Sequence, residues 1–431
     1  MPVDRAPHPG HQLQLLKGGE ALFPALVEAI DAARLEVRLE TYIFHFERSV
    51  LPVAGALERA AARGVVVNVV VDGMGTDEVP AEWQQRWAAA GVHWRIFNPA
   101  QGWRVLIPKR WRRMHRKLCV VDASVAFCGG INLLDDHYDP NYGALEEPRF
   151  DFAVCVRGPL VADMLDTMAR LWARLQVTHE AQKLDFAGAV EAVRAVAHAG
   201  TELGDADLPL PRQSFEPRPA DSGSGTEADG LADTVVRNAT AALVLRDNLR
   251  YRRSIEDTYR LAIGRAQREI LIANAYFIPG VQLQRSLLHA ARRGVKITLL
   301  LQGRYEYFMA FHAGRAVYGP LLDAGVEIIE YEASFLHAKV AVMDSESGAV
   351  ATVGSSNLDP LSLLLAREAN VFVRDDAFAA ELRGHLVEAI ATQGRRVDPA
   401  AHHRRGYMPR VMSWGAYAAM RLAVFLTGQH Y

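Results

Sequence analysis

The sequence repeats one order of short segments, and this repeat constrains the fold more strongly than any other feature. Residues 33–134 contain "ARLEVRLETYIF", "ALERAAARGVVVNVVVDG", "AAAGVHWRIFNP", "MHRKLCVVD" and "AFCGGINLL". Residues 266–359 contain "AQREILIANAYFIPG", "LLHAARRGVKITLLLQG", "LLDAGVEIIEY", "FLHAKVAVMD" and "ATVGSSNLD". The spacing of hydrophobic residues changes between strand-like and helix-like in the same order in both halves. The sequence therefore predicts two tandem α/β lobes.

Each half contains an apolar run that is typical of a strand buried on both faces. The runs are "VVVNVVVDG" and "VKITLLLQG", and both end at glycine. We therefore expect a mixed β-sheet in each lobe, flanked by helices. The stretch 201–230 is rich in Pro, Gly, Ser and acidic residues, which favours a solvated linker. The predicted boundaries are a first lobe over 11–200, a flexible polar linker over 201–235, a second lobe over 236–400 and a tail over 401–431.

One short motif occurs in both halves and carries the chemistry. It is a histidine, a lysine two residues later and an aspartate five residues after the lysine. The two copies are His115, Lys117, Asp122 and His337, Lys339, Asp344. On a strand each histidine and its lysine would project to the same face, because side chains alternate. The aspartate has the opposite parity and would lie where the strand ends.

A turn of small residues with an asparagine follows each motif. The turns are Gly129-Gly130-Ile131-Asn132 and Gly354-Ser355-Ser356-Asn357. Small residues let backbone amides and a carboxamide approach an anion closely, so phosphate is the natural ligand.

Three interpretations of the motif compete. A metal site would need several converging ligands, and the accompanying lysine would repel the ion. A single His-x-Lys pair on a strand would best be explained as a surface accident, but its repetition argues against that. In the third interpretation, one imidazole attacks phosphorus and the other protonates the leaving oxygen, while the lysines and asparagines hold the phosphoryl group. This chemistry needs no metal and no cofactor.

A nucleophilic histidine also needs a carboxylate that orients its ring. "PRFDFAVCV" offers Asp151 and "LAREANVFV" offers Glu368, each just ahead of an alternating apolar strand. A solvated acid at the start of a strand is the alternative for each of them.

Composition limits the class and the compartment. The 431 residues include 48 basic and 50 acidic ones, so the chain lacks the overall basic excess typical of a nucleic-acid binder. Cys119, Cys128 and Cys155 lie among apolar neighbours, which favours buried thiols in a reducing compartment over disulfides. Neither a secretory signal nor a run long enough to span a membrane is visible.

The paired motifs resemble those of the phospholipase D superfamily. The segments "ETYIF", "RRMHRKL", "GGIN", "RDNLRYRRSIE", "ANAYFIPG" and "TVGSSNLDPLSLLL" are similar to those of bacterial cardiolipin synthases, in particular the type without N-terminal transmembrane helices. The resemblance covers residues 13–375 apart from the linker. The chain departs from it at Ala366, where close relatives often have asparagine.

The resemblance implies a pseudo-twofold pair of lobes with the active site at their interface. It implies transfer of a phosphatidyl group between two phosphatidylglycerol molecules, which gives cardiolipin and glycerol. Carried over residue by residue, His115 is the nucleophile and His337 is the acid and then the base. The remaining assignments are phosphate binding by Lys117, Lys339, Asn132 and Asn357, orientation of the imidazoles by Asp151 and Glu368, and support of the catalytic motifs by Asp122 and Asp344.

Two basic regions and the C-terminus favour a lipid substrate over nucleic acid. "WRVLIPKRWRRMHRK" combines arginines, lysines and tryptophans, and "RDNLRYRR" with Arg246, Arg250, Arg252 and Arg253 could hold a headgroup. Residues 401–431 join a basic flank to an apolar aromatic helix, which is typical of an interfacial anchor. A terminal helix docked on the core is the alternative.

We therefore predict a peripheral protein on the cytoplasmic face of the bacterial cell membrane, with anionic phospholipid as its partner. The alternatives are a hydrolase that acts on phospholipid or nucleic acid with the same site, and an inactive lipid-binding scaffold. The acceptor is a second phospholipid or another alcohol. The sequence predicts neither the exact headgroups nor the oligomeric state.

Overall fold

The computed structural model describes residues 7–76, 78–99, 112–182, 235–247, 251–360 and 366–426. Contacts group the chain into two compact units, Met1–Leu165 with Thr234–Tyr431, and Asp166–Asp233. The first unit contains both repeated halves and both copies of the histidine-lysine motif. The predicted linker over 201–235 lies outside the described residues except for its last position.

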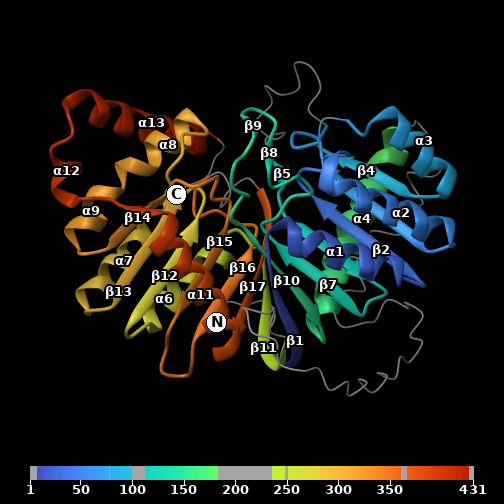
Figure 1. Ribbon diagram of the computed structural model, residues 1–431, viewed down its shortest axis with the longest axis horizontal. Helices are drawn as coiled ribbons and strands as arrows, with labels where there is room; N and C mark the ends of the chain where they lie inside the picture. The colour runs from blue at the N-terminus through green and yellow to red at the C-terminus, as the bar shows by residue number, and fades with distance from the viewer. Residues whose placement is uncertain are drawn as a thin grey trace. The chain divides into compact units, whose positions relative to one another are not determined.

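The repeated halves build one continuous sheet (Figure 1). The strands of the first half are β1 (His8–Lys17), β2 (Glu36–Thr41), β3 (Val66–Asp72), β4 (His93–Phe97), β5 (Arg113–Met114), β6 (Lys117–Val121), β7 (Val125–Gly129), β8 (Tyr138–Asp139), β9 (Gly143–Ala144) and β10 (Phe152–Arg157). Those of the second half are β11 (Val235–Arg246), β12 (Glu269–Asn274), β13 (Lys296–Gln302), β14 (Glu327–Tyr331), β15 (Lys339–Met343), β16 (Val350–Gly354), β17 (Ala366–Arg374) and β18 (Gly394–Arg396).

The strand order shows the internal symmetry. The first half runs β1-β10-β7-β6-β2-β3-β4 from the centre outward, and the second runs β11-β17-β16-β15-β12-β13-β14-β18. Strand for strand the two orders correspond, with β18 added at one edge. The two halves join where β1 pairs antiparallel with β11. The predicted pair of α/β lobes is confirmed, and a single mixed sheet runs through both of them.

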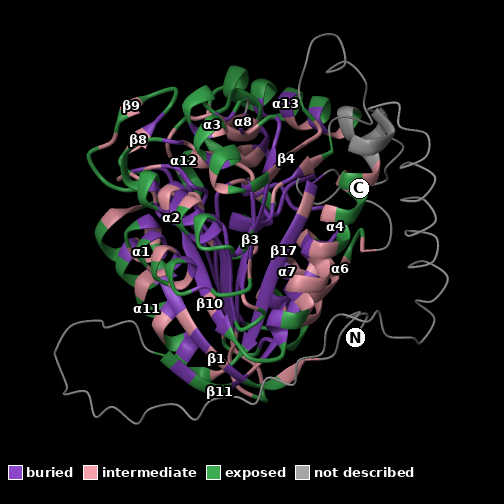
Figure 2. Cartoon of the chain, turned by 90° about the vertical axis from the view of Figure 1, so that its right-hand side faces the viewer, coloured by how far each residue is buried: buried purple, intermediate pink, exposed green. Residues whose placement is uncertain are grey.

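Helices cover both faces of this sheet, as predicted from the buried apolar runs. Figure 2 shows α1 and α11 on one face and α6 and α7 on the other. The helices are α1 (Gly18–Asp31), η1 (Arg48–Val50), α2 (Leu51–Ala62), α3 (Ala81–Ala90), α4 (Leu160–Gln182), α6 (Ser254–Arg265), α7 (Val281–Arg292), α8 (Phe308–Ala316), α9 (Tyr318–Asp323), α11 (Asp376–Gln393), α12 (Pro399–His403) and α13 (Tyr407–Leu426).

Each lobe has its own apolar core, in which a central strand packs under amphipathic helices. In the second lobe, α7 buries Leu283, Leu287 and Ala290, which recur at helical spacing on one face. The strand it covers, β13, is buried along almost its whole length, because helices lie on both sides. Cys119 and Cys128 are buried, and all three cysteines are free thiols.

The C-terminal helix docks by one face only. α13 contacts α8, and Ala416 and Met420 join Ile278 and Ala313 in a small apolar cluster. The docked arrangement is therefore present on one side of α13, and the opposite side is exposed. None of the described helices is long and apolar enough to cross a membrane.

Candidate active site

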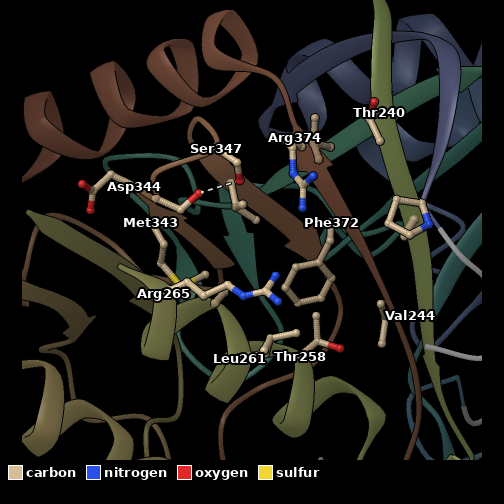
Figure 3. A pocket seen from close by; sticks show the side chains of 16 residues that line it. Thr240, Val244, Thr258, Leu261, Arg265, Met343, Asp344, Ser347, Phe372 and Arg374 are labelled. Carbon is tan, nitrogen blue, oxygen red and sulfur yellow. Dashed lines mark hydrogen bonds between the residues drawn. The ribbon is translucent and has the colours of Figure 1, made fainter. Parts of the chain in front are cut away.

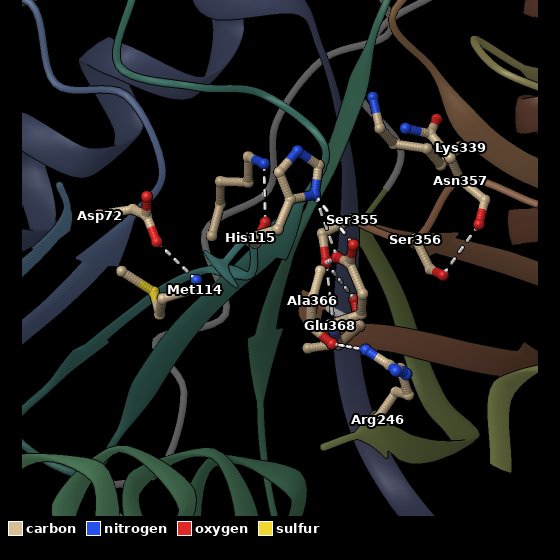
Figure 4. A network of polar contacts seen from close by, with 12 residues as sticks. Asp72, Met114, His115, Arg246, Lys339, Ser355, Ser356, Asn357, Ala366 and Glu368 are labelled. Carbon is tan, nitrogen blue, oxygen red and sulfur yellow. Dashed lines mark hydrogen bonds and ion pairs between the residues drawn. The ribbon is translucent and has the colours of Figure 1, made fainter. Parts of the chain in front are cut away.

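The segment that carries His115 pairs with the second lobe. Met114 lies opposite Arg367 in the parallel pair of β5 and β17, and the His115 amide donates to the Arg367 carbonyl at 3.0 Å. The next residue of β17 is Glu368, and Nδ1 of His115 lies 3.0 Å from its Oε1. The imidazole of the first motif is therefore oriented by a carboxylate of the second lobe (Figure 4).

The segment that carries His337 pairs with the first lobe in the same way. Leu336 forms a parallel bridge with Phe150, and the His337 amide donates to the Phe150 carbonyl at 2.9 Å. The next residue is Asp151, whose Oδ2 lies 2.6 Å from Nδ1 of His337. Each carboxylate therefore acts across the lobe interface on the other lobe's histidine. The sequence offered both acids but did not show this exchange.

Two polar residues at buried strand ends hold these segments, and sequence reasoning missed both. Oδ2 of Asp72, at the end of β3, accepts from the Met114 amide at 2.7 Å. In the second lobe, Oε1 of Gln302 accepts from the Leu336 amide at 3.2 Å. Each therefore fixes the residue just before a motif histidine. The signal was available, because "VVVDG" and "LLLQG" place a polar side chain at the same position of the repeat.

The histidines themselves precede the strands on which they were predicted. β6 begins at Lys117 and β15 begins at Lys339. Each lysine ammonium folds back to donate to the carbonyl of its own motif histidine, at 2.7 Å for Lys117. The aromatic ring of Tyr42 lies 4.9 Å from the His115 ring and 5.4 Å from the Lys117 ammonium.

Burial sets the protonation of the lysines. Burial lowers the pKa of Lys117 to about 7, with Glu368 opposing the shift and the charge of Lys339 adding to it. The pKa of Lys339 is also lowered, mainly by burial. A bound phosphate anion would relieve both effects, because it offsets lost solvation and separates like charges. Within the described ranges, no group of three or more histidine, cysteine or acidic side chains could hold a metal ion.

The two imidazoles differ in their electrostatic surroundings. Burial lowers the pKa of His115, and Glu368 partly offsets this. Burial lowers the pKa of His337 well below its usual value, and both motif lysines add to the effect. The pKa of Asp151 is raised to about 7 by burial, although Lys339 opposes the shift. The pair of His337 and Asp151 is therefore suited to hold one proton between two bases near neutral pH.

The residues behind the two carboxylates also differ. The Ser355 hydroxyl donates to Oε2 of Glu368 at 2.5 Å. The matching residue of the first lobe is Gly130, and a Cβ there would lie 2.4 Å from Oδ1 of Asp151. The glycine lets the shorter aspartate sit against the turn, whereas the serine reaches the longer glutamate with a hydroxyl.

One backbone amide of each small-residue turn is bonded to the sheet. The Gly130 amide donates to the Phe152 carbonyl and the Ser355 amide to the Ala369 carbonyl, both at 3.0 Å. These bonds join each turn to the strand of the orienting acid. The prediction of a turn whose amides bind an anion is therefore wrong at these two positions, since the amides complete the sheet.

The two predicted asparagines have different partners. Oδ1 of Asn132 accepts from the Ile43 amide at 3.3 Å, so this side chain supports the loop that follows β2. Asn357 is buried, and its Oδ1 has no hydrogen-bond partner within the described residues. Asn357 is therefore the better placed of the two to bind a substrate.

The motif aspartates lie at the opposite ends of their strands from the histidines. Asp122 accepts from the amides of Arg34, Leu35 and Glu36 at 2.8–2.9 Å. Asp344 accepts in the same way from the amides of Arg268 and Glu269. These contacts agree with support of the motif strands, and they place neither carboxylate beside a reacting group.

Two arginines that were predicted to belong to exposed basic clusters are buried. Arg116 forms an ion pair with Glu40 inside the first lobe. Arg246 lies opposite Glu368 in the register of β11 and β17, and it donates to the Ala366 carbonyl. The prediction that these two side chains meet a lipid surface or headgroup is therefore wrong. The run 100–111 lies outside the described residues.

An apolar pocket of the second lobe is remote from this chemistry. It is lined by Met343, Val244 and Phe372, with Arg265 and Arg374 also on its wall (Figure 3). It lies beside Asp344, which is at the end of the motif strand away from the histidines, so it is not part of the active site.

The two lobes match, and each contributes one His-x-Lys motif to the lobe interface. This arrangement defines a phospholipase D-like protein. A family model described as "Cardiolipin synthase, PLD-like domain" matches residues 26–146 and 259–389. The chain belongs to this family.

Individual proteins that are similar to this chain support the same family. The chain is 35% identical to cardiolipin synthase B of Escherichia coli strain K12 and of Shigella flexneri over 428 residues, which are 97% of this chain and 90% of each relative. Among solved structures, phosphatidylserine synthase of Haemophilus influenzae Rd KW20 shares the fold, with a TM-score of 0.64 at 11% identity over 97% of this chain and 96% of that one. The chain is a phosphatidyltransferase of the cardiolipin synthase type.

Proposed function

We propose that this enzyme joins two phosphatidylglycerol molecules into cardiolipin and glycerol, through a phosphohistidine intermediate, at the cytoplasmic surface of an anionic membrane. The observation that carries the proposal is the exchange of carboxylates across the lobe interface. Each motif imidazole uses Nδ1 for the other lobe's acid. Each Nε2 is therefore left for chemistry at phosphorus.

In the first step, Nε2 of His115 attacks the phosphorus of the donor lipid. A P–N bond forms and the bond from phosphorus to the headgroup glycerol oxygen breaks. His337 gives its Nε2 proton to that oxygen, so neutral glycerol leaves. Glu368 stabilises the charge that develops on the His115 ring, because it accepts the Nδ1 proton in a charge-assisted hydrogen bond.

In the second step, His337 acts as the base. It takes the proton of a headgroup hydroxyl on the second phosphatidylglycerol, and the resulting oxygen attacks phosphorus and breaks the P–N bond. Cardiolipin leaves, and His337 is protonated again for the next turnover. The raised pKa of Asp151 supports this cycle, because a carboxylate that titrates near 7 keeps the proton within the pair.

Lys117, Lys339 and Asn357 are assigned to the phosphoryl oxygens. The buried ammonium groups supply the positive charge that a divalent ion supplies in other phosphoryl-transfer sites. Asn132, which occupies the position of Asn357 in the first repeat, is assigned to the same phosphate-binding role. Its Oδ1 accepts a hydrogen bond from the Ile43 amide in this structure.

The test is a product analysis of purified protein on phosphatidylglycerol vesicles, with and without a chelator. Cardiolipin and glycerol in equal amounts support the transfer. Phosphatidic acid as the main product would show that water is the acceptor, which would make the enzyme a phospholipase D-type hydrolase. Activity that the chelator abolishes would contradict the metal-free scheme. His115→Ala serves as the inactive control, and His337→Ala should show strongly reduced transfer.

A further inference from the structure

Exposed apolar side chains gather on two packed helices of the second lobe. α8 and α13 contact each other, and their outward surface is here called the α8–α13 face. Its exposed members include Phe308, Met309, Met408, Val411, Trp414 and Leu422. Single exposed apolar residues are ordinary, but several of them on two helices in contact are typical of an interaction site.

The sequence of α13 is apolar on both sides of the helix. Ser413, Ala416 and Met420 recur at helical spacing on the buried side. Trp414 and Leu422, on the outward side, are 57% and 58% exposed. Large apolar side chains on the outward side of a helix that is already packed on its inward side are expected to have a partner.

The charges of the face indicate what that partner is. Neither α8 nor α13 contains an acidic residue. Arg410 is exposed on α13, and Arg404 is exposed in the turn that leads into it. Aromatic and aliphatic side chains beside cations, without acids, are typical of a surface that meets anionic lipid headgroups and the outer part of the acyl chains.

The face is continuous with the active site. Tyr305 and Tyr307, just before α8, are exposed. Glu306 between them accepts a hydrogen bond from the Tyr276 hydroxyl at 2.5 Å, and Tyr276 follows Asn274, which pairs with Lys339 in the sheet. Across the lobe interface, the Tyr142 hydroxyl donates to the carbonyls of Tyr305 and Glu306 at 3.2 and 3.1 Å. Figures 1 and 2 show α8, α13 and the β8–β9 hairpin at the same end of the unit. A bilayer on this face would therefore present headgroups at the rim of the catalytic seam.

We propose that the α8–α13 face docks the enzyme on an anionic phospholipid bilayer, with the second lobe as the membrane-binding lobe. The inference rests on the proposed function for the identity of the partner, since a lipid transferase must reach substrate in a bilayer. It assigns docking to a half-exposed helix that stays packed on the core, so no membrane-spanning segment is required.

The experiment compares Leu422→Ser with Leu35→Ser in the full chain. The two leucines are matched, because they are 58% and 59% exposed, and Leu35 lies in the first lobe beside Asp122. Binding is measured by co-sedimentation with vesicles of equal parts phosphatidylglycerol and phosphatidylcholine. Leu422→Ser is expected to weaken binding by about tenfold, whereas Leu35→Ser is expected to leave it unchanged. Leu422→Ser together with Trp414→Ser is expected to weaken binding by about 100-fold.

Activity on two substrates separates this inference from the proposed function. The Trp414/Leu422 variant should lose activity on vesicles but keep wild-type activity on short-chain, monomeric phosphatidylglycerol, which also shows that it folds. Equal vesicle binding by wild type and this variant would overturn the docking face. Conversion of a dimer into a monomer without a change in vesicle binding would also overturn it, by showing that a second copy covers the face. A wild-type protein that binds vesicles but transfers no phosphatidyl group would contradict the proposed function alone.

Discussion

The two half-sites are built on the same strands but differ behind the imidazole. Glu368 is met by the Ser355 hydroxyl, and it lies opposite the buried Arg246 in the sheet register. Asp151 is met by a glycine turn, and its pKa is raised by burial and, to a smaller extent, by the nearby Asp136. Burial raises the pKa of Asp151 even though Lys339 and Lys117 oppose the shift, so this acid can share a proton with His337. The difference suits His115 to nucleophilic attack and His337 to proton transfer.

Removal of the imidazoles should show this division most strongly. His115→Ala is expected to lower kcat by about 10⁵-fold or more, because no nucleophile remains. His337→Ala is expected to lose about 10²- to 10⁴-fold, the usual contribution of a general acid. A p-nitrophenyl phosphodiester, which needs no protonated leaving group, should restore the first step in His337→Ala but not in His115→Ala. Equal rescue of both variants would contradict the division of roles.

Substitutions in the two turns that contact Asp151 and Glu368 should give the next largest difference in kcat. Gly130→Ala should lower kcat by about 100-fold, because the new Cβ would lie 2.4 Å from Oδ1 of Asp151 and must displace it. Ser355→Ala removes one hydrogen bond to Glu368 and should cost about tenfold. The measurement is kcat at saturating lipid, with circular dichroism to confirm folding. A Ser355→Ala loss larger than that of Gly130→Ala would show that the two turns do not act as described.

The pKa values of the active-site groups predict that kcat/KM falls steeply at basic pH. Lys117, whose pKa is lowered to about 7, is charged below that pH and neutral above it. Asp151, whose pKa is raised to about 7, is protonated below that pH. As the pH rises, both groups therefore lose a proton that the reaction uses. For this reason kcat/KM of the free enzyme should fall above a pH of about 7. Lys117→Arg should move this fall to higher pH, since a guanidinium stays charged. A profile that is flat to pH 9 would count against the assignment.

The smallest expected effect is that of the buried arginine. Arg246→Met should lower kcat by less than about tenfold, because the residue opposite Glu368 in the sheet then carries no charge and donates no hydrogen bond to the Ala366 carbonyl. Arg246→Lys should restore part of the activity. The exposed Arg374 on the neighbouring strand β17 provides the control, and Arg374→Met should leave kcat unchanged.

Much of this architecture could be predicted from the sequence because it repeats. The repeat predicts two lobes, and the two motifs and their acids follow from matching positions in it. The exchange of carboxylates could not be predicted, because it depends on Met114 and Leu336 pairing across the lobes. The burial of Arg116 and Arg246 was missed for a similar reason, since a basic run shows charge but not which residues fold inward.

The half-exposed C-terminal helix illustrates a further limit of the sequence. Its composition predicted an anchor or a docked helix, and α13 combines a docked side with an outward apolar side. Only the contact with α8 shows which residues lie on each side, and that division leads to the α8–α13 face as the docking surface.

The most direct test of the mechanism is to identify the phosphorylated residue. His337→Ala, mixed briefly with the p-nitrophenyl phosphodiester of a diacylglycerol and quenched, should accumulate the intermediate, because the base for the second step is missing. Peptide mass spectrometry is then expected to find the phosphatidyl group on His115 and on no other residue. Modification of another residue, or release of p-nitrophenol without any adduct on His115, would contradict the central claim that His115 is the nucleophile of a covalent transfer.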